Sequence, residues 1–382
     1  MVNPFFYPFR GGTENYVLDL SKYLVSKGHE VDVICSREKG QAKEENLFGI
    51  NVHRLNSIIL YKLPALLPPP YAHPIGYTYT GYKLLKKINP DFIHLHSRYF
   101  LSYYPLLLHK KLLHKKLFLT IHNSRPEDIN WQTNFFGGLF DDLFGNFLMR
   151  RTDFIFANSQ YSLDVTVPKN YPKKQTGVAY NGIYVKNWKR RKTNLKDEVG
   201  AEFLLLTDAR LVPQKGIEYL LEAVKGLDFD FHLIIKGRFD ASGFDYENKI
   251  RKLMSSRELK GRVTLKPERL TEEEMVELYS AADVFVLPSL HEPFGIVLIQ
   301  AMAAETPVVS TNVGGIPEVL ADTALMVPSR DSEALRKAIE KYLSDSKLRK
   351  KKAKEAYERV KKNFDWSVVG KQVEEVYEQF LN

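Results

Sequence analysis

The chain has 382 residues, 44% of them hydrophobic and 26% charged, a balance typical of a soluble globular protein, and this length predicts two domains of ordinary size. Its only cysteine, Cys35, excludes a disulfide within the chain. The net charge is +9, and a surplus of 8 lies in residues 1–185, where 22 Lys and Arg face 14 Asp and Glu. This asymmetry favours a membrane surface or a phosphorylated acceptor as partner over nucleic acid, although a solvated basic face explains it equally well.

No stretch has the features of an export signal or a membrane span. The apolar start of the chain is interrupted by Pro4, Pro8 and Arg10, and the run IILYKLPALLPPPY is broken by Lys62 and four prolines. The sequence therefore predicts a cytoplasmic protein, with association at the inner membrane surface as an alternative.

Short runs of β-branched or aromatic residues alternate with helical patterns along the first half, as in parallel sheets with crossover helices. The strands expected there are EVDVIC, NVHRL, DFIHLH, KLFLTIH and DFIFANS. Before them, apolar residues recur every three or four positions, which predicts a helix over Thr13–Lys27 with Gly28 as its C-terminal cap.

The start of the chain fits this scheme poorly. A first strand should precede the loop NPFFYPFRGG, yet only Met1 and Val2 stand before it. Either this strand is very short or the natural chain begins a few residues upstream.

The second half repeats the alternation, with expected strands EFLLLTDAR, FHLIIKG, RVTLKP, DVFVLPS, PVVSTN and ALMVP. The turn Asn181-Gly182 and the polar, basic stretch Lys186–Lys196 separate the two series. We therefore expect an α/β protein with two doubly wound, Rossmann-like domains, at residues 1–184 and 185–364, and a C-terminal helix at 365–382. The crevice between two such domains is the expected ligand site.

Two stretches place glycines or cations where strands give way to helices. Gly11-Gly12 opens a helix, where backbone N–H groups and the helix dipole favour a phosphate, although tight turns use such a pair for geometry alone. Arg210 ends a strand, and Lys215 follows just before the helix that begins at Gly216. Two cations at the carboxyl end of a strand suit a diphosphate and the charge it develops on leaving, with surface ion pairing as the alternative.

A third stretch, VLPSLHEPFGIVLIQAM, combines an acid with a helix start. Glu292 follows a strand that ends near Ser289, and the backbone N–H groups of Phe294, Gly295 and Ile296 begin the next helix. Such a turn offers an acceptor for sugar hydroxyls beside donors for an oxyanion. Gln300 lies one turn inside that helix, on a face that could point to the same place.

On these motifs the chain resembles the family 4 glycosyltransferases, which have the two-domain GT-B fold and include glycogen synthase and phosphatidylinositol mannosyltransferase. The resemblance covers nearly the whole chain through RGGTENYVLDLSKYLVSKGHEVDVI, DFIHLHS, TIHN, ANSQYS, YNGI, ARLVPQKGIEYLLEA and PSLHEPFGIVLIQAMAAETPVVSTNVGGIPEV. The last two motifs are long and specific.

The resemblance implies a retaining enzyme that moves a hexose from a nucleoside diphosphate sugar without a metal or other cofactor. In the second domain, Arg210 and Lys215 would clamp the diphosphate, and Glu292 would hold hydroxyls of the donor sugar. The backbone of Phe294–Ile296 would meet the sugar and the phosphate.

The resemblance assigns the acceptor, which we leave open as a glycan, a lipid-linked molecule or a small molecule, to the first domain. There Gly12, next to Gly11, would offer a backbone amide to the donor, and His122 would lie beside the sugar near the reacting centre. The acceptor would attack on the face that the phosphate leaves, with that phosphate helping to take the acceptor's proton. The helix at residues 365–382 would return to this domain.

The chain departs from the family's Glu-x7-Glu pair, which reads here Glu292 and Gln300. The second acid ordinarily binds ribose hydroxyls. Glutamine keeps an acceptor oxygen but loses the charge, so each such bond should weaken by about 1 kcal/mol and donor affinity by an order of magnitude or less. We expect a weaker hold on the nucleotide with transfer retained. Tyr184 and the loop Arg238–Asp240 also depart from the family pattern, with no defined effect.

Two polar patterns suggest metals but have simpler explanations. Asp228 and Asp230 form an Asp-x-Asp pattern that we interpret as a polar turn, because it stands between Gly226 and a strand. His94 and His96 share one face of a strand, and we expect them to be hydrogen-bonded, with His96 at the rim of the crevice.

Two amphipathic stretches of the first half suggest a membrane. In YYPLLLHKKLLHKKLFL, lysines and leucines separate onto two helix faces, as in an interfacial helix or in a crossover helix with a solvated basic side. Further on, Phe136, Phe140, Phe144 and Phe147 have helical spacing and are expected to face the core, whereas Trp131 and Phe135 could line an acceptor pocket.

Other functions on the same fold remain open at this point. The alternative is a non-catalytic nucleotide-sugar-binding protein, which Gln300 and the short first strand permit. An epimerase or a phosphorylase is disfavoured by HEPFGI together with ARLVPQKG, and no lysine stands out as a pyridoxal phosphate anchor.

Overall fold

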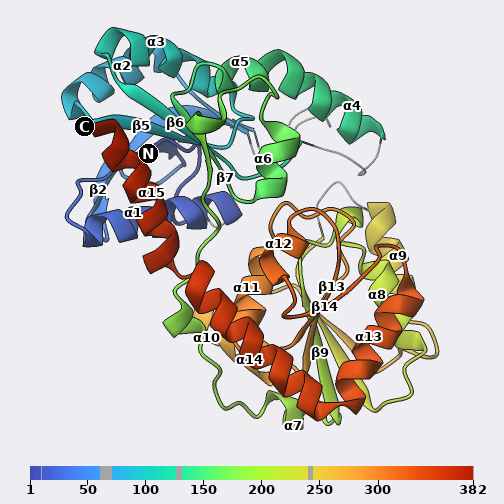
Figure 1. The fold of residues 1–382 in the computed structure, drawn as a ribbon. Helices are drawn as coiled ribbons and strands as arrows, with labels where there is room; N and C mark the ends of the chain where they lie inside the picture. Colours follow the sequence, from blue (N-terminus) through green and yellow to red (C-terminus); the bar gives the residue numbers. More distant parts are fainter. Residues whose placement is uncertain (10, 61–70, 126–130, 240–243, 382) are drawn as a thin grey trace. The chain divides into compact units, whose positions relative to one another are not determined.

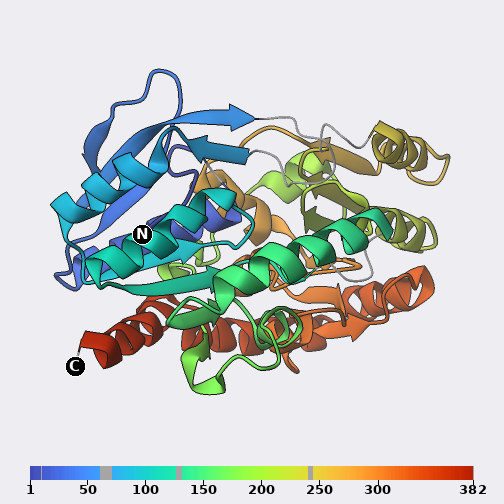
Figure 2. The same ribbon diagram turned by 90° about the horizontal axis from the view of Figure 1, so that it is seen from above.

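The computed structural model describes residues 1–9, 11–60, 71–125, 131–239 and 244–381. Arg10, Lys62 and Asp240, which the sequence patterns singled out, lie outside these ranges. The chain folds into two compact units: unit 1 comprises Met1–Gly182 and Trp366–Asn382, and unit 2 comprises Ile183–Asp365. Both chain ends lie in unit 1 (Figures 1 and 2).

Unit 1 contains eight strands among its described residues: β1 (Asp32–Arg37), β2 (Glu44–Leu47), β3 (Ile50–Leu60), β4 (Tyr71–Pro74), β5 (Phe92–His96), β6 (Lys116–Ile121), β7 (Phe154–Ala157) and β8 (Thr176–Val178). Its helices are α1 (Gly12–Ser26), α2 (Tyr77–Ile88), α3 (Tyr104–Leu113), α4 (Trp131–Phe140), α5 (Asn146–Met149), α6 (Gln160–Thr166) and α15 (Trp366–Leu381). A π-helical turn at Asp141–Gly145 joins α4 to α5.

The sheet of unit 1 has a central strand that is reduced almost to one residue. On one side β1 pairs with β3 in parallel, and on the other β5, β6, β7 and β8 follow one another in parallel. Val2 bridges the two parts, because it pairs with Ile34 of β1 and with Leu95 of β5. The short segment around Val2 therefore takes the place of the first strand in the sheet, so this strand is present but very short.

The last helix, α15, packs on α1 inside unit 1. The Tyr23 hydroxyl of α1 donates to Oε2 of Glu374 at 2.9 Å, and the buried Trp366 ring contacts Tyr16 edge-on, with 5.3 Å between ring centroids. Gly370 lies directly under the Tyr23 ring, where a Cβ atom would come within 2.4 Å of ring carbons. The expected return of the C-terminal helix to the first domain is confirmed.

Unit 2 is built on the strands β9 (Phe203–Asp208), β10 (Phe231–Lys236), β11 (Val263–Lys266), β12 (Val284–Leu287), β13 (Val308–Thr311) and β14 (Leu325–Val327). Its helices are α7 (Leu195–Val199), α8 (Ile217–Lys225), α9 (Phe244–Met254), α10 (Glu272–Ala281), α11 (Ile296–Ala303), α12 (Ile316–Leu320), α13 (Ser332–Ser344) and α14 (Ser346–Asn363). The described strands pair in the order β11-β10-β9-β12-β13-β14, all in parallel.

Helices cover both faces of this sheet, with α8 and α13 on one face and α11 and α12 on the other (Figure 1). The strands are therefore buried on both faces and read as nearly continuous apolar runs, such as Phe203–Leu206. This pattern made them the most predictable elements of the chain.

All the strands expected from the sequence are present, and both units are doubly wound α/β domains, as predicted. The expected helix over Thr13–Lys27 is α1, with Gly28 in the left-handed region behind it at φ +92°. The sequence analysis missed β2, β4 and β8. The residues of β2, Glu44–Leu47, are mostly polar because this antiparallel edge strand is largely exposed, so it lacks a strand's usual apolar signature.

The contact between Tyr23 and Gly370 predicts the effect of a small substitution. Gly370→Ala should lower the free energy of unfolding by about 1–3 kcal/mol, because the added methyl group overpacks the seam between α1 and α15. Urea denaturation would measure this change, with Gln372→Ala on the exposed side of α15 as control. Equal stability of both variants would show that the seam tolerates the methyl group.

Candidate active site

The strand order of unit 2 reverses between β9 and β12. The chain proceeds outward from β9 to β10 and β11, then returns to lay β12 on the other side of β9. Loops that leave two neighbouring strands in opposite directions open a crevice at their carboxyl ends, which is where doubly wound sheets bind ligands. The loop after β9 carries Arg210 and Lys215, and the loop after β12 carries Glu292.

Lys215 and Glu292 join these two loops. Nζ of Lys215 donates to Oε2 of Glu292 at 2.5 Å, and both side chains are largely buried, with 15% and 10% of their side-chain surface exposed. Leu290 N–H also donates to the carbonyl of Gln214 at 2.8 Å. The structure therefore brings together the cation and the acid that the sequence placed 77 residues apart.

The backbone around Glu292 is held by a glycine pair that sequence reasoning did not assign to the site. Gly315 N–H donates to the Glu292 carbonyl at 2.9 Å, and a Cβ on Gly314 would stand 2.1 Å from that same oxygen. Gly314 also has φ +58°, which disfavours side chains. The sequence signal was the Gly-Gly of NVGGIPE, which leaves room for the Glu292 loop.

The turn after Glu292 has the predicted form. Phe294 is buried and meets the Phe364 ring edge-on, with 5.7 Å between centroids, so its backbone rather than its side chain faces the site. Gly295 is the N-cap of α11 with φ +88°, and Ile296 is the first helical residue. The first N–H groups of α11 have no partner within the helix, as at any helix start.

Arg210 lies two residues beyond the end of β9, and it is exposed. Its backbone carbonyl accepts from Val212 N–H at 3.0 Å, which turns the chain toward Lys215. Arg210 thus brings a guanidinium to this edge of the sheet, whereas the Lys215 ammonium is held by Glu292.

Gln300 belongs to a polar cluster that the sequence did not predict. Tyr279 of α10 is fully buried, and its hydroxyl lies 2.9 Å from Oδ2 of Asp208 and 3.5 Å from Oε1 of Gln300. The shorter contact identifies Asp208 as the main acceptor of the hydroxyl proton. A carboxylate therefore stands at the end of β9, near the amide that replaces the family's second acid.

Burial raises the pKa of the Asp208 carboxyl to about 6, while the Tyr279 hydroxyl and the nearby Lys236 ammonium oppose the rise. Lys236 pairs in register with Asp208 at the end of β10, but its Nζ donates to the Glu268 carbonyl at 2.8 Å. The motif TDAR could have drawn attention to Asp208, because an acid that ends a buried strand must find partners or a ligand.

In unit 1, Gly11 and Gly12 lie where predicted, at the start of α1. Gly11 is the N-cap, and a Cβ on Gly12 would meet no atom within 4 Å. Oε2 of Glu14 would stand 2.3 Å from a Cβ on Gly11, so an acid of the first turn reaches back to this helix start. Burial raises the pKa of Glu14.

His122 follows β6 and takes part in a buried aromatic cluster. Its Nε2 lies 3.2 Å from Nδ1 of His96, and the Tyr16 ring meets it edge-on at 4.8 Å. Burial lowers the pKa of His122 to about 3, so the ring is neutral at neutral pH. A neutral imidazole can donate or accept a hydrogen bond to a sugar but cannot act as a strong acid there.

His94 and His96 are hydrogen-bonded, as expected, and burial lowers the pKa of each. Nε2 of His94 lies 2.7 Å from the Thr120 hydroxyl, and its Nδ1 pairs with the Tyr377 hydroxyl. The prediction that His96 stands at a rim was wrong, because its side chain has no exposed surface. The rings of Tyr16 and His122 cover it, with centroids 5.8 and 5.5 Å from that of His96.

Family models match almost the whole chain. Residues 10–187 match the model described as Glycosyltransferase Family 4, and residues 188–359 match the one described as Glycosyl transferases group 1. The chain belongs to glycosyltransferase family 4. It is thus a glycosyltransferase with the GT-B fold that its two doubly wound units display.

Two relatives by sequence and one solved structure of the same fold are similar to this chain. An uncharacterized glycosyltransferase of Methanocaldococcus jannaschii is 27% identical over 410 positions, which cover 97% of this chain and 95% of that protein. The phosphatidylinositol N-acetylglucosaminyltransferase gpi3 subunit of Schizosaccharomyces pombe is 23% identical over 394 positions, covering 100% of this chain and 80% of that protein. The structure of Anabaena HepE with UDP-glucose has a TM-score of 0.78 at 19% identity, covering 99% and 98% of the two chains.

The described part of this glycosyltransferase contains no cluster of side chains that could bind a metal ion. There, no three His, Cys, Asp or Glu side chains are arranged to hold an ion. Asp228 and Asp230 form a turn at the amino-terminal edge of the sheet, where Oδ2 of Asp230 accepts from Glu202 N–H at 3.0 Å. This edge is opposite to that of Glu292, so the interpretation as a polar turn is confirmed.

The glycosyltransferase also exposes apolar side chains on unit 1. The phenylalanine stripe was expected to face the core, but Phe144 and Phe147 are exposed and Phe136 and Phe140 are only partly buried. The reason is the π-helical turn, which shifts the face of α5 relative to α4. A buried bidentate pair, Arg98 with Asp141, anchors this turn.

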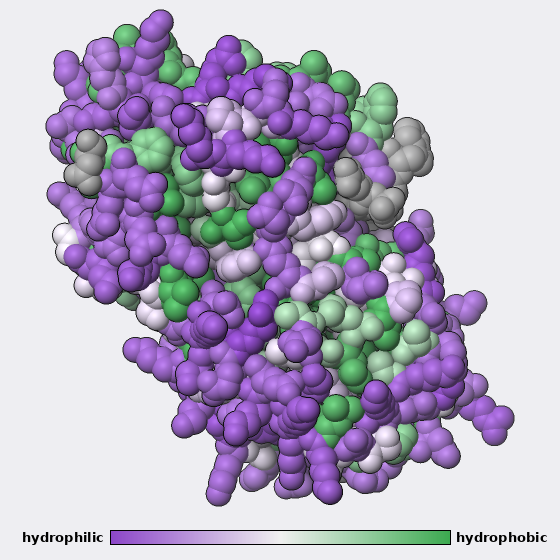
Figure 3. Space-filling model, viewed as in Figure 1, coloured by the Kyte–Doolittle hydropathy of each residue, from purple (hydrophilic) through white to green (hydrophobic). Residues whose placement is uncertain are grey.

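Together these side chains form a surface that we call the α3–α5 face. It consists of Leu108, Leu112, Phe135, Leu139, Leu143, Phe144 and Phe147, with Lys111, Arg150 and Arg151 exposed among them. Figure 3 shows green apolar atoms among the purple ones in this region of unit 1. Leu143 is 59% exposed and Phe135 60%. Of the two residues considered for an acceptor pocket, Phe135 lies on this face, and the Trp131 side chain lies outside the described part.

Proposed function

We propose that this chain is a retaining, metal-independent hexosyltransferase that uses a nucleoside diphosphate sugar. The observation that carries the proposal is the ion pair between Lys215 and Glu292 across the β9–β12 switch point. This pair places a fixed cation and a fixed acceptor side by side, where a diphosphate and the hydroxyls of its sugar would both be bound. HepE, which shares the fold, is solved with UDP-glucose, and this supports the class of donor.

The cations of unit 2 would take the part that a divalent metal plays in other transferases. As the bond between the anomeric carbon and the phosphate oxygen breaks, negative charge develops on the departing diphosphate. Lys215 is already positioned by Glu292, so its charge requires little reorganisation as the transition state forms. Arg210 would add a second, bidentate contact.

The transfer we propose proceeds on one face of the sugar. The acceptor oxygen forms its bond to the anomeric carbon on the side from which the phosphate leaves, and the acceptor proton passes to an oxygen of that phosphate. No enzyme carboxylate forms a covalent intermediate in this scheme. Glu292 orients the sugar, and the neutral His122 ring is suited to hydrogen-bond a hydroxyl of it.

Asp208 supplies the carboxylate that Gln300 lacks. It lies at the same strand edge as Arg210, two residues away, and shares the Tyr279 hydroxyl with Gln300. We assign Asp208 and Gln300 together to the ribose hydroxyls of the nucleotide, one as a charged acceptor and one as a neutral one. The carboxylate of Asp208 at the end of β9 thereby offsets the loss of charge at position 300.

For the acceptor we favour a lipid-linked molecule at a membrane surface. The α3–α5 face combines bulky apolar side chains with Lys111, Arg150 and Arg151, the combination that binds at an anionic interface. No helix in the described part of the chain is long and apolar enough to cross a bilayer. The gpi3 relative is a subunit of a phosphatidylinositol N-acetylglucosaminyltransferase, which supports such an acceptor.

The donor can be identified by turnover of UDP-, GDP-, ADP- and dTDP-sugars in the presence of EDTA and lipid extract. We expect release of one nucleotide without added metal, and loss of this activity by on the order of 100-fold in Glu292→Ala, because both the sugar contact and the partner of Lys215 are removed. Glu273→Ala, an exposed acid on α10, is the control. Binding of a nucleotide sugar without turnover would instead favour a non-catalytic binding protein, and near-wild-type transfer by Glu292→Ala would refute the site.

The role of Asp208 can be tested with the nucleoside diphosphate that the panel identifies. Asp208→Asn should weaken its binding about tenfold, while the 2′,3′-dideoxy analogue should bind both proteins equally. Because the pKa of Asp208 is about 6, the wild type should lose more affinity than the variant as the pH falls from 7 to 5, whereas protonation of the terminal phosphate in the same range weakens binding to both proteins. Isothermal titration calorimetry measures the dissociation constants of both proteins. If Asp208→Asn weakened binding of the dideoxy analogue by the same factor, a contact between Asp208 and the ribose would be excluded.

Membrane binding can be tested by co-sedimentation with phosphatidylcholine vesicles, with and without phosphatidylglycerol. Binding should require the anionic lipid, and Leu143→Asp should weaken it about tenfold, since one exposed leucine would no longer enter the interface. Leu381→Asp, which is equally exposed but lies on α15, should bind as the wild type does. Identical behaviour of the two variants would remove the α3–α5 face from the proposal.

A further inference from the structure

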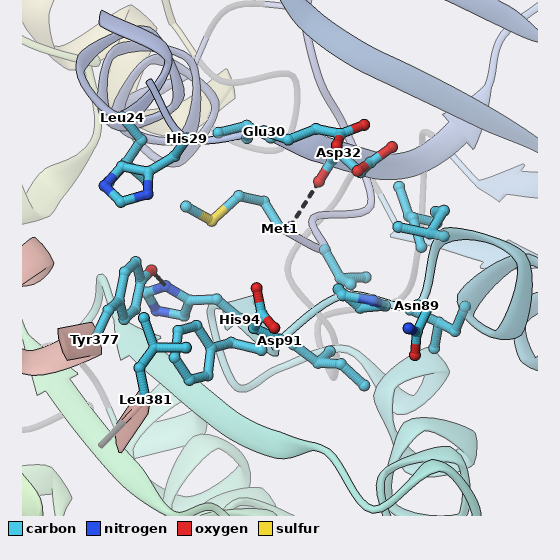
Figure 4. A pocket seen from close by; sticks show the side chains of 18 of the residues that line it. Met1, Leu24, His29, Glu30, Asp32, Asn89, Asp91, His94, Tyr377 and Leu381 are labelled. Atoms are coloured by element: carbon cyan, nitrogen blue, oxygen red, sulfur yellow. Dashed lines mark hydrogen bonds between the residues drawn. The ribbon is translucent and has the colours of Figure 1, made fainter. Parts of the chain in front are cut away.

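The ring of His122 is held by fewer hydrogen bonds than the ring of His94. His94 lines the cavity drawn in Figure 4, and both of its ring nitrogens have partners: Nδ1 pairs with the Tyr377 hydroxyl and Nε2 with the Thr120 hydroxyl. In His122, Nε2 lies 3.2 Å from Nδ1 of His96, and no hydrogen bond joins Nδ1 to any residue that the structure describes. This nitrogen is available to a ligand, provided that the ring is held in place from elsewhere.

The backbone at His122 is held by two polar side chains. Nδ2 of Asn158, just after β7, donates to the His122 carbonyl at 2.9 Å. The next carbonyl along the chain, that of Asn123, accepts from Nη1 of Arg98, just after β5. The segments that follow three neighbouring strands, β5, β6 and β7, are thus joined around His122. The direction of the His122 side chain follows from this backbone.

Arg98 is itself fixed by several partners. It is 1% exposed, and its pair with Asp141 is bidentate: Nε donates to Oδ1 at 2.6 Å and Nη2 to Oδ2 at 2.7 Å. Nη2 also donates to the Tyr99 hydroxyl at 2.7 Å. Since Nη1 meets the Asn123 carbonyl, all three guanidinium nitrogens have partners. The planar guanidinium therefore holds Asn123 in one defined position relative to the π-helical turn that carries Asp141.

A buried ion pair is by itself weak evidence of a stabilising role. The cost of taking both charges out of water can exceed the gain from their attraction, and apolar side chains of similar volume often replace such a pair without loss of stability. Apolar side chains at positions 98 and 141 would preserve the packing but not the hydrogen bond to Asn123. This hydrogen bond is the contribution specific to Arg98.

We propose that Arg98 is a positioning residue for the transfer reaction. Held by Asp141, it fixes the backbone at Asn123 and so keeps the His122 ring where Nδ1 can bind a hydroxyl of the donor sugar. The proposal rests on the proposed role of His122 in transfer. Its structural half, that Arg98 fixes the ring, does not depend on the reaction.

The test is the double variant Arg98→Met with Asp141→Leu, which replaces the pair by apolar side chains and removes the donor to Asn123. In the wild type, burial holds the pKa of His122 at about 3, so its C2 proton should not titrate between pH 5 and 8. In the variant the ring should become accessible, and its pKa should rise toward the ordinary value of about 6.5. NMR of histidine-labelled protein measures this, with His122→Gln identifying the signal.

The same variant should lose rate rather than donor affinity. We expect kcat to fall about tenfold, whereas KM for the donor should stay within about a factor of two, because Lys215 and Glu292 of unit 2 are unchanged. Arg98→Lys keeps the charge beside Asp141 but lacks the fork that also meets Asn123. It should show the same two changes to a smaller degree, and it provides the test if the double variant does not fold.

A neighbouring ion pair offers a matched control. Arg125 and Asp142 join the same loop to the same π-helical turn, at 2.6 Å and 3.0 Å, but 32% and 53% of their side-chain surface is exposed. Arg125→Gln with Asp142→Asn should leave both the His122 signal and kcat as in the wild type.

Three results would overturn the proposal: a His122 that stays untitrated in the Arg98 variants, a His122 that titrates while kcat is unchanged, or equal effects of the two double variants. The titration requires no substrate. It therefore decides whether Arg98 fixes the ring even if no nucleotide sugar is turned over.

Discussion

The parallel sheet imposes the constraint from which the chemistry of this chain follows. All described strands of unit 2 end at the same edge, and their order reverses between β9 and β12. Loops from distant parts of the sequence therefore meet at that edge, and Lys215 pairs with Glu292 there. The glycines at 216 and 314 have positive φ and leave space for backbone oxygens of the facing loop. The position of the candidate site thus follows from one reversal in strand order.

Much of this arrangement could be predicted because each signal was local. Apolar runs bounded by polar turns identify buried parallel strands, and a cation or an acid just after such a run must lie at the functional edge. Arg210, Lys215 and Glu292 were found in this way. The pairing of Lys215 with Glu292 followed from the fold, since no local pattern relates residues so far apart.

What the sequence could not provide were contacts that depend on neighbouring elements. The role that we propose for Asp208 depends on its hydrogen bond with Tyr279 of α10, and the two residues come together only in the folded unit. The exposure of Phe144 and Phe147 depends on a π-helical turn, which shifts the helical period by one residue without a sequence pattern that announces it. The edge strand β2 lacked the apolar residues that reveal a strand.

The path of the chain between the units gives unit 2 a further property. It enters at Ile183 and leaves at Asp365, and these two residues form an isolated parallel β-bridge, with Ile183 N–H donating to the Phe364 carbonyl at 2.9 Å. Unit 2 is therefore an insertion whose two ends meet. A domain whose two ends lie side by side can be exchanged between related proteins as one piece, because both junctions are at the same place. If unit 2 binds the donor as we propose, donor specificity can be inherited in this way without any change in the half of the protein that carries both termini.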